Sequence, residues 1–190
     1  MPRRPRGVIT DCFVHVIARG NRELPIFHEE RDYEFFLRLL ESDKSRHGAR
    51  IHAFCLMSNH FHLLVEVGPV PLSELMHAVL HRYAEFVNRL HGFHGHLFGD
   101  RFWARVCDSD AYALALVRYI HLNPCRAGIT PYPDAYRWST HRVYLGMSQV
   151  PWVTTTLLDL LSADRARAHE QYVRLVHDAV TEPFRDRVFE

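Results

Sequence analysis

Two histidines, His60 and His62, flank one phenylalanine in the apolar run SNHFHLLVEV at residues 58–67. Alternate side chains of a β-strand share a face, so both histidines point to one side together with Leu64 and Glu66, and the other side is wholly apolar. Neutral imidazole is a common ligand for divalent metal ions, and two such ligands leave coordination positions open for substrate oxygens. The pattern indicates a metal site for phosphoryl chemistry. The alternative is a half-buried strand with two hydrogen-bonded histidines.

A second group of reactive side chains lies in the segment DAYALALVRYIHLNP, which we expect to be a helix. Its members recur at helical spacing and form one stripe of Tyr112, Leu116, Tyr119 and Asn123. If the stripe packs on the histidine face, one helix brings a tyrosine hydroxyl and an amide oxygen to that face. The alternatives are an aromatic stripe that belongs to the core and an Asn123 that caps the helix. His121 is two residues from Tyr119 and points away from the stripe.

The elements that must position these side chains can be read from the periodicity of the chain. Alternating β-branched residues predict four strands, with a hairpin between the second and third, at 12–19, 49–57, 60–67 and 101–107. Helical spacing predicts helices at 29–47, 71–90 and from 109 or 110 to 123. Gly48 stops the first helix, Pro124 prevents continuation of the third, and two more short helices are expected from 151 onward.

The order of these elements is β-α-β-β-α-β, the split βαβ arrangement of a ferredoxin-like antiparallel sheet, followed by a further helix. We therefore predict the α+β class. In this arrangement the first and third strands pair, so His15 could lie beside the histidine pair. A purely structural role for His15 is the alternative.

The composition is that of one globular domain, with 47% hydrophobic residues in a chain of 190. No apolar run approaches the roughly 18 residues that a membrane helix needs, and the basic first residues lack the apolar core of a signal peptide. We therefore expect no membrane partner and a cytoplasmic, nucleoid-associated protein. The four widely spaced cysteines predict neither a disulfide framework nor a zinc finger. The net charge of +1 does not by itself indicate a nucleic-acid partner.

Three linked motifs resemble those of one known family. His60-Phe61-His62 resembles the His-hydrophobic-His motif of the HUH endonuclease superfamily. The strings FCLMSNHFHLLVEV, RYIHLNPCRAG and YRWSTHRVYLG resemble the REP-associated tyrosine transposases of the insertion-sequence-200-like group. The resemblance implies the HUH nuclease fold, a ferredoxin-like sheet with an added catalytic helix. It also implies a single-tyrosine transposase domain at 1–146 and a helical C-terminal appendage at 147–190.

By this resemblance Tyr119 is the nucleophile, His60 and His62 bind Mg²⁺ or Mn²⁺, and Asn123 stands where relatives supply a third ligand. The implied protein is a metal-dependent single-stranded DNA endonuclease and strand transferase, a transposase. It would cleave and rejoin hairpin or repeat DNA through a 5′-phosphotyrosine intermediate. A monomer acting in cis is expected, with a homodimer as the alternative. Two other functions stay open, a domesticated hairpin-DNA-binding protein that no longer cuts and a histidine–metal phosphoesterase that forms no covalent adduct.

Segments that mix arginines with aromatic or polar residues are typical of proteins that grip single strands by phosphate contacts and stacking. The residues we predict to bind DNA are Arg3, Arg4, Arg19, Asn21, Arg22, Arg101, Trp103 and Arg105. The alternative is that these arginines are solvated surface residues. Many relatives have glutamine and glycine where this chain has Gly99 and Asp100, a difference that concerns DNA handling by the loop rather than the chemistry.

Overall fold

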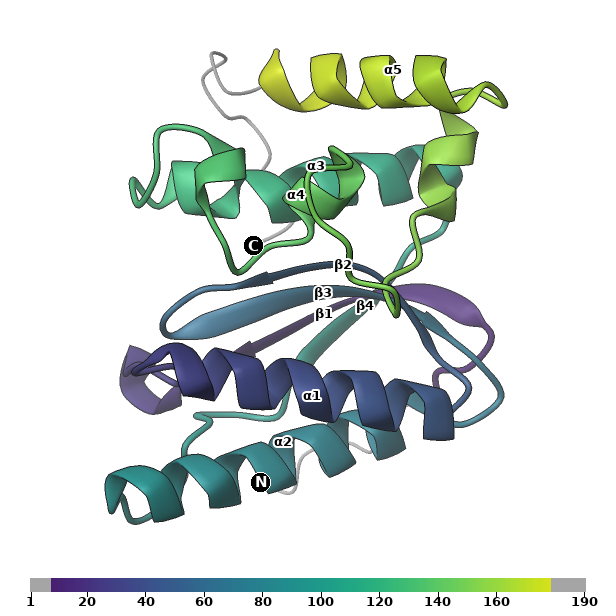
Figure 1. Cartoon of the computed structure of the whole chain (residues 1–190). Helices are drawn as coiled ribbons and strands as arrows, with labels where there is room; N and C mark the ends of the chain where they lie inside the picture. The colour runs from purple at the N-terminus through teal and green to yellow at the C-terminus, as the bar shows by residue number, and fades with distance from the viewer. Residues whose placement is uncertain (1–7, 179–190) are drawn as a thin grey trace.

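A four-stranded antiparallel sheet separates two helical layers in the computed structural model, which describes residues 8–178 (Figure 1). The strands lie in the order β2-β3-β1-β4 and are β1 (Cys12–Arg19), β2 (Arg50–Leu56), β3 (His60–Val67) and β4 (Trp103–Val106). One layer consists of α1 (Glu30–Arg46) and α2 (Leu72–His91). The other consists of α3 (Asp110–Arg126), α4 (His141–Tyr144) and α5 (Arg165–His177). This confirms the predicted α+β class and order of elements.

Short 3-10 helices complete the described chain at η1 (Asn21–Glu23), η2 (Pro133–Ala135) and η3 (Thr156–Leu160). Of the two short helices expected after residue 151, the first is therefore η3 and the second is α5. Within residues 8–178, no helix is both long and apolar enough to cross a lipid bilayer. Arg3 and Arg4 lie outside the described residues.

Strand β3 serves both layers because its side chains alternate between them. Phe61, Leu63, Val65 and Val67 are buried in the core formed with α1 and α2. Leu64, on the opposite face, belongs to a second core formed with α3 and α5. The predicted division of this strand into an apolar face and a histidine face is therefore confirmed.

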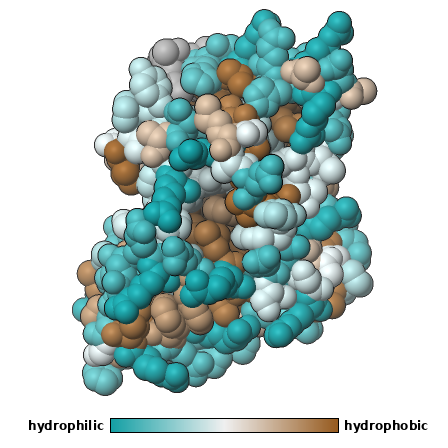
Figure 2. Space-filling view, in the orientation of Figure 1, coloured by the Kyte–Doolittle hydropathy of each residue, from teal (hydrophilic) through white to brown (hydrophobic). Residues whose placement is uncertain are grey.

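The outer edge of the sheet is covered by the chain that follows α3. Strand β2 occupies this edge, and its backbone exchanges hydrogen bonds with two later segments. The N–H of Leu56 donates to the carbonyl of Trp138 at 2.9 Å, that of Thr140 to Phe54 at 3.0 Å, and that of Thr154 to Ile51 at 2.9 Å. An edge strand with paired backbone groups offers no template for another chain. In Figure 2, hydrophobic residues are visible where the molecule narrows between its two layers.

The sequence predicts the beginning of helix α3 correctly but not its end. Its beginning is as expected, since the Ser109 side chain caps it by accepting a hydrogen bond from the N–H of Tyr112 at 3.3 Å. The prediction that Pro124 ends the helix is wrong, because Pro124 lies inside it and the helix continues to Arg126. Proline removes only one N–H, and the N–H of Ala127 still donates to the carbonyl of Asn123 at 3.0 Å. Gly128, with φ of +67°, follows the end of the helix.

A buried chain of hydrogen bonds joins β2, α3, α4 and α5. His121 of α3 contacts the hydroxyl of Thr140 through Nε2 at 2.8 Å and that of Tyr172 through Nδ1 at 2.7 Å. Thr140 also bonds the backbone of Phe54 in β2, and Tyr172 contacts Nδ1 of His141 at 2.5 Å.

One arrangement of protons satisfies all of these contacts. Thr140 donates to the carbonyl of Phe54 and accepts from Nε2–H of His121. Tyr172 then donates to Nδ1 of His121 and accepts from Nδ1–H of His141. Nε2 of His141, which has no hydrogen-bond partner, is left as an acceptor. Every side-chain donor within this network has an acceptor, so the network fixes α3 between the sheet and α5.

We predict that Tyr172→Phe lowers the free energy of unfolding by about 1–3 kcal/mol, because it leaves the buried Nδ1 of His121 without its donor. Urea unfolding followed by circular dichroism measures the change. Tyr132→Phe is the matched control, since Tyr132 is 57% exposed, and it should alter stability by less than about 0.5 kcal/mol. Equal stability of the Tyr172→Phe and wild-type proteins would show that the network does not hold the helix.

We also predict that stability falls as the pH drops from 6.5 toward 4. Burial lowers the pKa of His141 from 6.5 to about 4 and lowers the pKa of His121 well below 6.5. The folded protein keeps both rings neutral, whereas the unfolded chain takes up protons below about pH 6.5. Their contribution is therefore fully present above pH 6.5 and is lost toward pH 4. Urea unfolding at a series of pH values tests this, and His141→Gln should flatten the slope by up to about 1.4 kcal/mol per pH unit. An unchanged slope in His141→Gln would contradict the assignment.

Candidate active site

The face of the sheet that carries His60 and His62 also collects residues from β1 and β4. Directly opposed residues of antiparallel strands point the same way. Arg19 pairs with His60, and His15 pairs with Leu64 on one side and with Arg105 on the other. Three of the residues that we predicted to bind DNA therefore share the histidine face, namely Arg19, Trp103 and Arg105.

His60 is held by a hydrogen bond from the hairpin turn that precedes it. Its Nδ1 lies 2.7 Å from Oδ1 of Asn59, an acceptor, so this nitrogen carries the proton and Nε2 keeps its lone pair. The side chain of Asn123 lies beside the ring. Burial, followed by the positive charge of Arg19, lowers the pKa of His60 to about 4, against the opposing effect of Asn123. The ring is therefore neutral near pH 7.

His62 is held by a third histidine, His15, at a distance of 3.0 Å between its Nδ1 and Nε2 of His15. The two rings stack with an interplanar angle of 18°. Burial, followed by the electrostatic repulsion that protonated His62 would have with His15 and His60, holds the pKa of His62 well below its usual range. Burial, followed by the charge of Arg105, lowers the pKa of His15 to about 3. When His62 donates to His15, its Nε2 is the nitrogen left to bind a ligand, an arrangement common among metal-binding histidines.

Helix α3 lays the predicted stripe on this face. The ring of Tyr119 is 5.4 Å from that of His62 and 6.0 Å from that of His15, measured between centroids, and it is 5% exposed. Nδ2 of Asn123 donates to the backbone carbonyl of Tyr119 at 3.4 Å, so its Oδ1 is left as an acceptor atom. The sheet and the helix thus bring Tyr119, His60, His62 and Asn123 together.

The sequence interpretation missed Arg126, whose guanidinium carbon lies 4.5 Å from the centroid of the Tyr119 ring. Arg126 follows Tyr119 by about two helical turns and Asn123 by about one, so it continues the spacing of the stripe. Helical spacing alone therefore places Arg126 on the same stripe as Tyr119 and Asn123. The sequence interpretation left it out because it placed the end of the helix at Pro124.

The donor set fits a divalent cation. His60 and His62 offer two neutral imidazole nitrogens from rings whose centroids are 5.1 Å apart, and Asn123 offers an amide oxygen. Two nitrogens and one oxygen suit Mn²⁺ more readily than Mg²⁺, which prefers oxygen ligands alone. The orientation of both rings is fixed by hydrogen bonds at the opposite nitrogen, so little freedom would be lost on binding.

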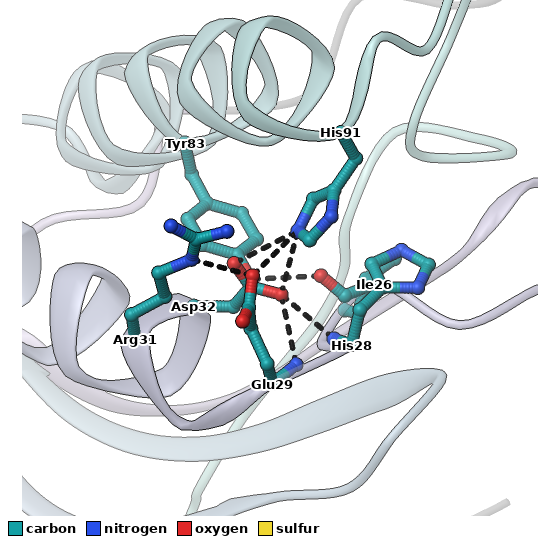
Figure 3. Close-up of polar contacts among 7 residues, drawn as sticks. All are labelled: Ile26, His28, Glu29, Arg31, Asp32, Tyr83 and His91. Atoms are coloured by element: carbon teal, nitrogen blue, oxygen red, sulfur yellow. Dashed lines mark hydrogen bonds and ion pairs between the residues drawn. The ribbon is translucent and has the colours of Figure 1, made fainter.

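A second group of ligand atoms that could hold a metal ion lies apart from the sheet, where Glu29, Asp32 and His91 come within 4.8 Å of one another (Figure 3). Each already has partners. Asp32 accepts the backbone N–H groups of His28 and Glu29 and contacts His91, while Glu29 pairs with Arg31. These contacts form the N-terminal cap of α1, and we assign the group a structural role.

The remaining predicted DNA-binding residues lie off the histidine face. Asn21 and Arg22 belong to η1 and line a cavity next to the loop after α2. Arg101 lines a different cavity, between α2 and the loop that follows it. The structure therefore divides the described candidates between the face around His60 and two neighbouring cavities.

Comparison with known proteins shows the family of the chain. No curated protein matches it. The solved structure of a REP-associated tyrosine transposase bound to a REP hairpin has a TM-score of 0.65 and 15% identity, over 81% of this chain and 98% of that one. A proposed transposase from Deinococcus radiodurans R1 has a TM-score of 0.43 and 17% identity, over 63% of this chain and 95% of that one. The tRNA(His) guanylyltransferase of Saccharomyces cerevisiae has a TM-score of 0.47 and 8% identity, over 99% of this chain and 86% of that one.

The first of these structures shares the fold of this chain, which agrees with the resemblance seen in its motifs. The family model described as "Transposase IS200 like" matches residues 8–123, which include β1 through the histidine pair to Asn123. The chain belongs to the IS200-like transposase family.

Proposed function

We propose that this transposase cleaves and rejoins single-stranded DNA with Tyr119 as the nucleophile. The observation that carries the proposal is the position of the Tyr119 ring, 5.4 Å from the His62 ring and on the same face as His60 and Asn123. Hairpin or repeat DNA is the proposed substrate, since the structure that shares this fold is of a protein bound to a REP hairpin.

In the proposed step, the phenolic oxygen of Tyr119 attacks the phosphorus of a phosphodiester. A new bond forms between this oxygen and phosphorus, and the bond from phosphorus to the 3′ oxygen breaks. The phenolic proton passes to solvent or a nearby base, and the departing 3′ oxygen takes up a proton to become a free 3′-OH. The phosphotyrosine bond keeps the energy of the cleaved link, so a second 3′-OH can reverse the step and join a new strand.

His60, His62 and Asn123 are the proposed ligands of the Mn²⁺ or Mg²⁺ ion. A divalent ion held there would polarise the phosphodiester and offset charge that develops in the transition state. The two imidazoles stay neutral because burial disfavours their charged forms, as the lowered pKa values of His60 and His62 indicate. Arg126, whose guanidinium lies over the Tyr119 ring, would place a positive charge near the proposed nucleophile.

We predict that Tyr119→Phe abolishes covalent adduct while hairpin binding changes less than about two-fold, since a buried ring of equal size is kept. The measurement is a denaturing gel of the protein with Mn²⁺ and labelled hairpin oligonucleotides from repeats that flank its own gene. Wild-type protein should give a metal-dependent band that resists SDS. Formation of covalent adduct by the Tyr119→Phe protein would contradict the assignment of Tyr119 as the nucleophile.

The same gel, together with a binding assay and an assay of small-phosphoester hydrolysis, distinguishes the other two functions from this one. Binding by the wild-type protein without any covalent band, across metals and flanking sequences, would favour a domesticated binder. Hydrolysis of small phosphoesters that persists in Tyr119→Phe would favour a histidine–metal phosphoesterase.

We further propose that the site is complete within one chain, as a monomer acting in cis. Helix α3 packs on the sheet of its own chain and is bonded there through His121, Thr140 and Tyr172. Tyr119→Phe and His60→Ala proteins, mixed in equal amounts, should therefore form no more adduct than either alone. Recovery of adduct in the mixture would mean that two chains share a site and would overturn this proposal.

A further inference from the structure

A cavity of about 660 Å³ lies between η1, which follows β1, and the glycine- and histidine-rich loop that follows α2. Two of its lining residues, Asn21 and Arg22, follow closely on Arg19, the residue of β1 that pairs with His60. Among the residues that line it are one arginine, three histidines, an asparagine and an exposed aromatic ring: Arg22, His28, His94, His96, Asn88 and Phe93.

Backbone hydrogen bonds hold η1 and the end of β1 against the loop that follows α2. The N–H of Asn21 donates to the carbonyl of Leu97 at 2.8 Å, and that of Gly99 donates to Arg19 at 3.1 Å. A Cβ on Gly99 would approach Cα of Asn21 to 3.3 Å, so the two segments are in close contact. The cavity is therefore formed before any ligand arrives.

His28, which also lines the cavity, is held by the buried carboxylate of Asp32 (Figure 3). This carboxylate accepts the N–H of His28 at 2.8 Å and contacts Nε2 of His91 at 3.1 Å. The Phe93 ring stacks on His91, with centroids 5.4 Å apart and an angle of 22°, and also meets the His28 ring at 5.1 Å. Phe93 is nevertheless 43% exposed, so part of its ring remains open to a ligand.

The turn that carries Arg22 has an unfavourable backbone conformation. Arg22 and Glu23 both have positive φ, at 53° and 61°, a region that non-glycine residues rarely adopt. Such strain persists where surrounding structure enforces it, often at functional sites. Here Nδ2 of Asn59 donates to the carbonyl of Glu23 at 3.1 Å, while Oδ1 of the same Asn59 holds His60. One side chain thus links the strained turn to a candidate metal ligand.

The charge of the cavity favours an anionic ligand. Arg22 is the permanently charged group that lines it, and none of the described residues that line it is acidic. The nearby Asp32 carboxylate is buried and already engaged by the N–H of His28 and by His91. The nearest carboxylate in sequence, that of Glu23, pairs instead with Arg19 at 3.4 Å. A guanidinium and an exposed aromatic ring in one cavity match a phosphate and a nucleobase.

We propose that this cavity binds an unpaired nucleotide of the DNA substrate, with its base on Phe93 and its phosphate on Arg22. The inference rests on the proposed function and adds to it a site for single-stranded DNA outside the hairpin stem. From this cavity a strand would pass along η1 and the Arg19 end of β1 toward His60.

The test compares two DNA ligands in EDTA, where no cleavage occurs. One is a labelled blunt hairpin, and the other is the same hairpin with about eight unpaired thymidines on its 5′ or 3′ end. Fluorescence anisotropy should show that wild-type protein binds one extended hairpin at least about ten-fold more tightly than the blunt one. Phe93→Leu should lose most of this gain and bind the blunt hairpin as before. Leu160→Ala on η3 is the control and should keep the gain.

Arg22→Gly separates binding from folding at the strained turn. Glycine adopts positive φ without penalty, so the urea midpoint should stay the same or rise. The slope of log affinity against log salt for the extended hairpin should fall by about 0.7, the value for one phosphate contact of a single strand. Arg22→Lys should keep the slope.

The outcomes distinguish this proposal from the proposed function. If Phe93→Leu and Arg22→Gly keep the full gain, or wild-type protein shows none, the cavity does not bind DNA, whereas adduct formation by Tyr119 can still stand. If the gain depends on both residues but no adduct forms with Mn²⁺, the cavity proposal holds and the proposed chemistry fails. If wild-type protein binds neither hairpin, both are overturned.

Discussion

The position of Tyr119 depends on the hydrogen bonds that His121 makes from the other side of the same helix. Thr140 and Tyr172 hold the two nitrogens of His121 at 2.8 and 2.7 Å, and Thr140 is in turn bonded to β2. Helix α3 therefore cannot rotate or slide without breaking buried hydrogen bonds. The last described helix, α5, contributes Tyr172 and so takes part in placing a nucleophile that lies on the opposite side of α3.

Burial is what makes the histidine face suitable for a metal ion. His15, His60 and His62 all have lowered pKa values because their charged forms are poorly solvated there, and neutral nitrogens are the ones that bind metals. The same burial would be costly for unpaired polar atoms, and the hydrogen bonds that His60 donates to Asn59 and His62 donates to His15 offset that cost. Asn59 also bonds the turn that holds Arg22, so the candidate metal site and the candidate nucleotide cavity share one positioning residue.

Much of the fold and part of the site could be predicted from local patterns. The alternation of residues 60–67 predicts which face of β3 carries the histidines, and helical spacing predicts that Tyr119 and Asn123 point together. The role of Arg126 was not predicted, because Pro124 removes one backbone hydrogen bond without ending the helix. The bond between His15 and His62 and the network around His121 join residues far apart in sequence, so no local pattern encodes them. The cavity beside Phe93 likewise depends on how two loops meet.

The most direct test of the central claim is mass spectrometry of the protein–DNA adduct after nuclease and trypsin digestion. Trypsin cuts after Arg118 and Arg126, so the peptide YIHLNPCR contains Tyr119 and no other tyrosine, whereas Tyr112 falls in the preceding peptide. We predict that the mass of a nucleotide phosphate appears on YIHLNPCR alone. A modified peptide containing Tyr112, or an unmodified YIHLNPCR in protein purified as adduct, would contradict the assignment.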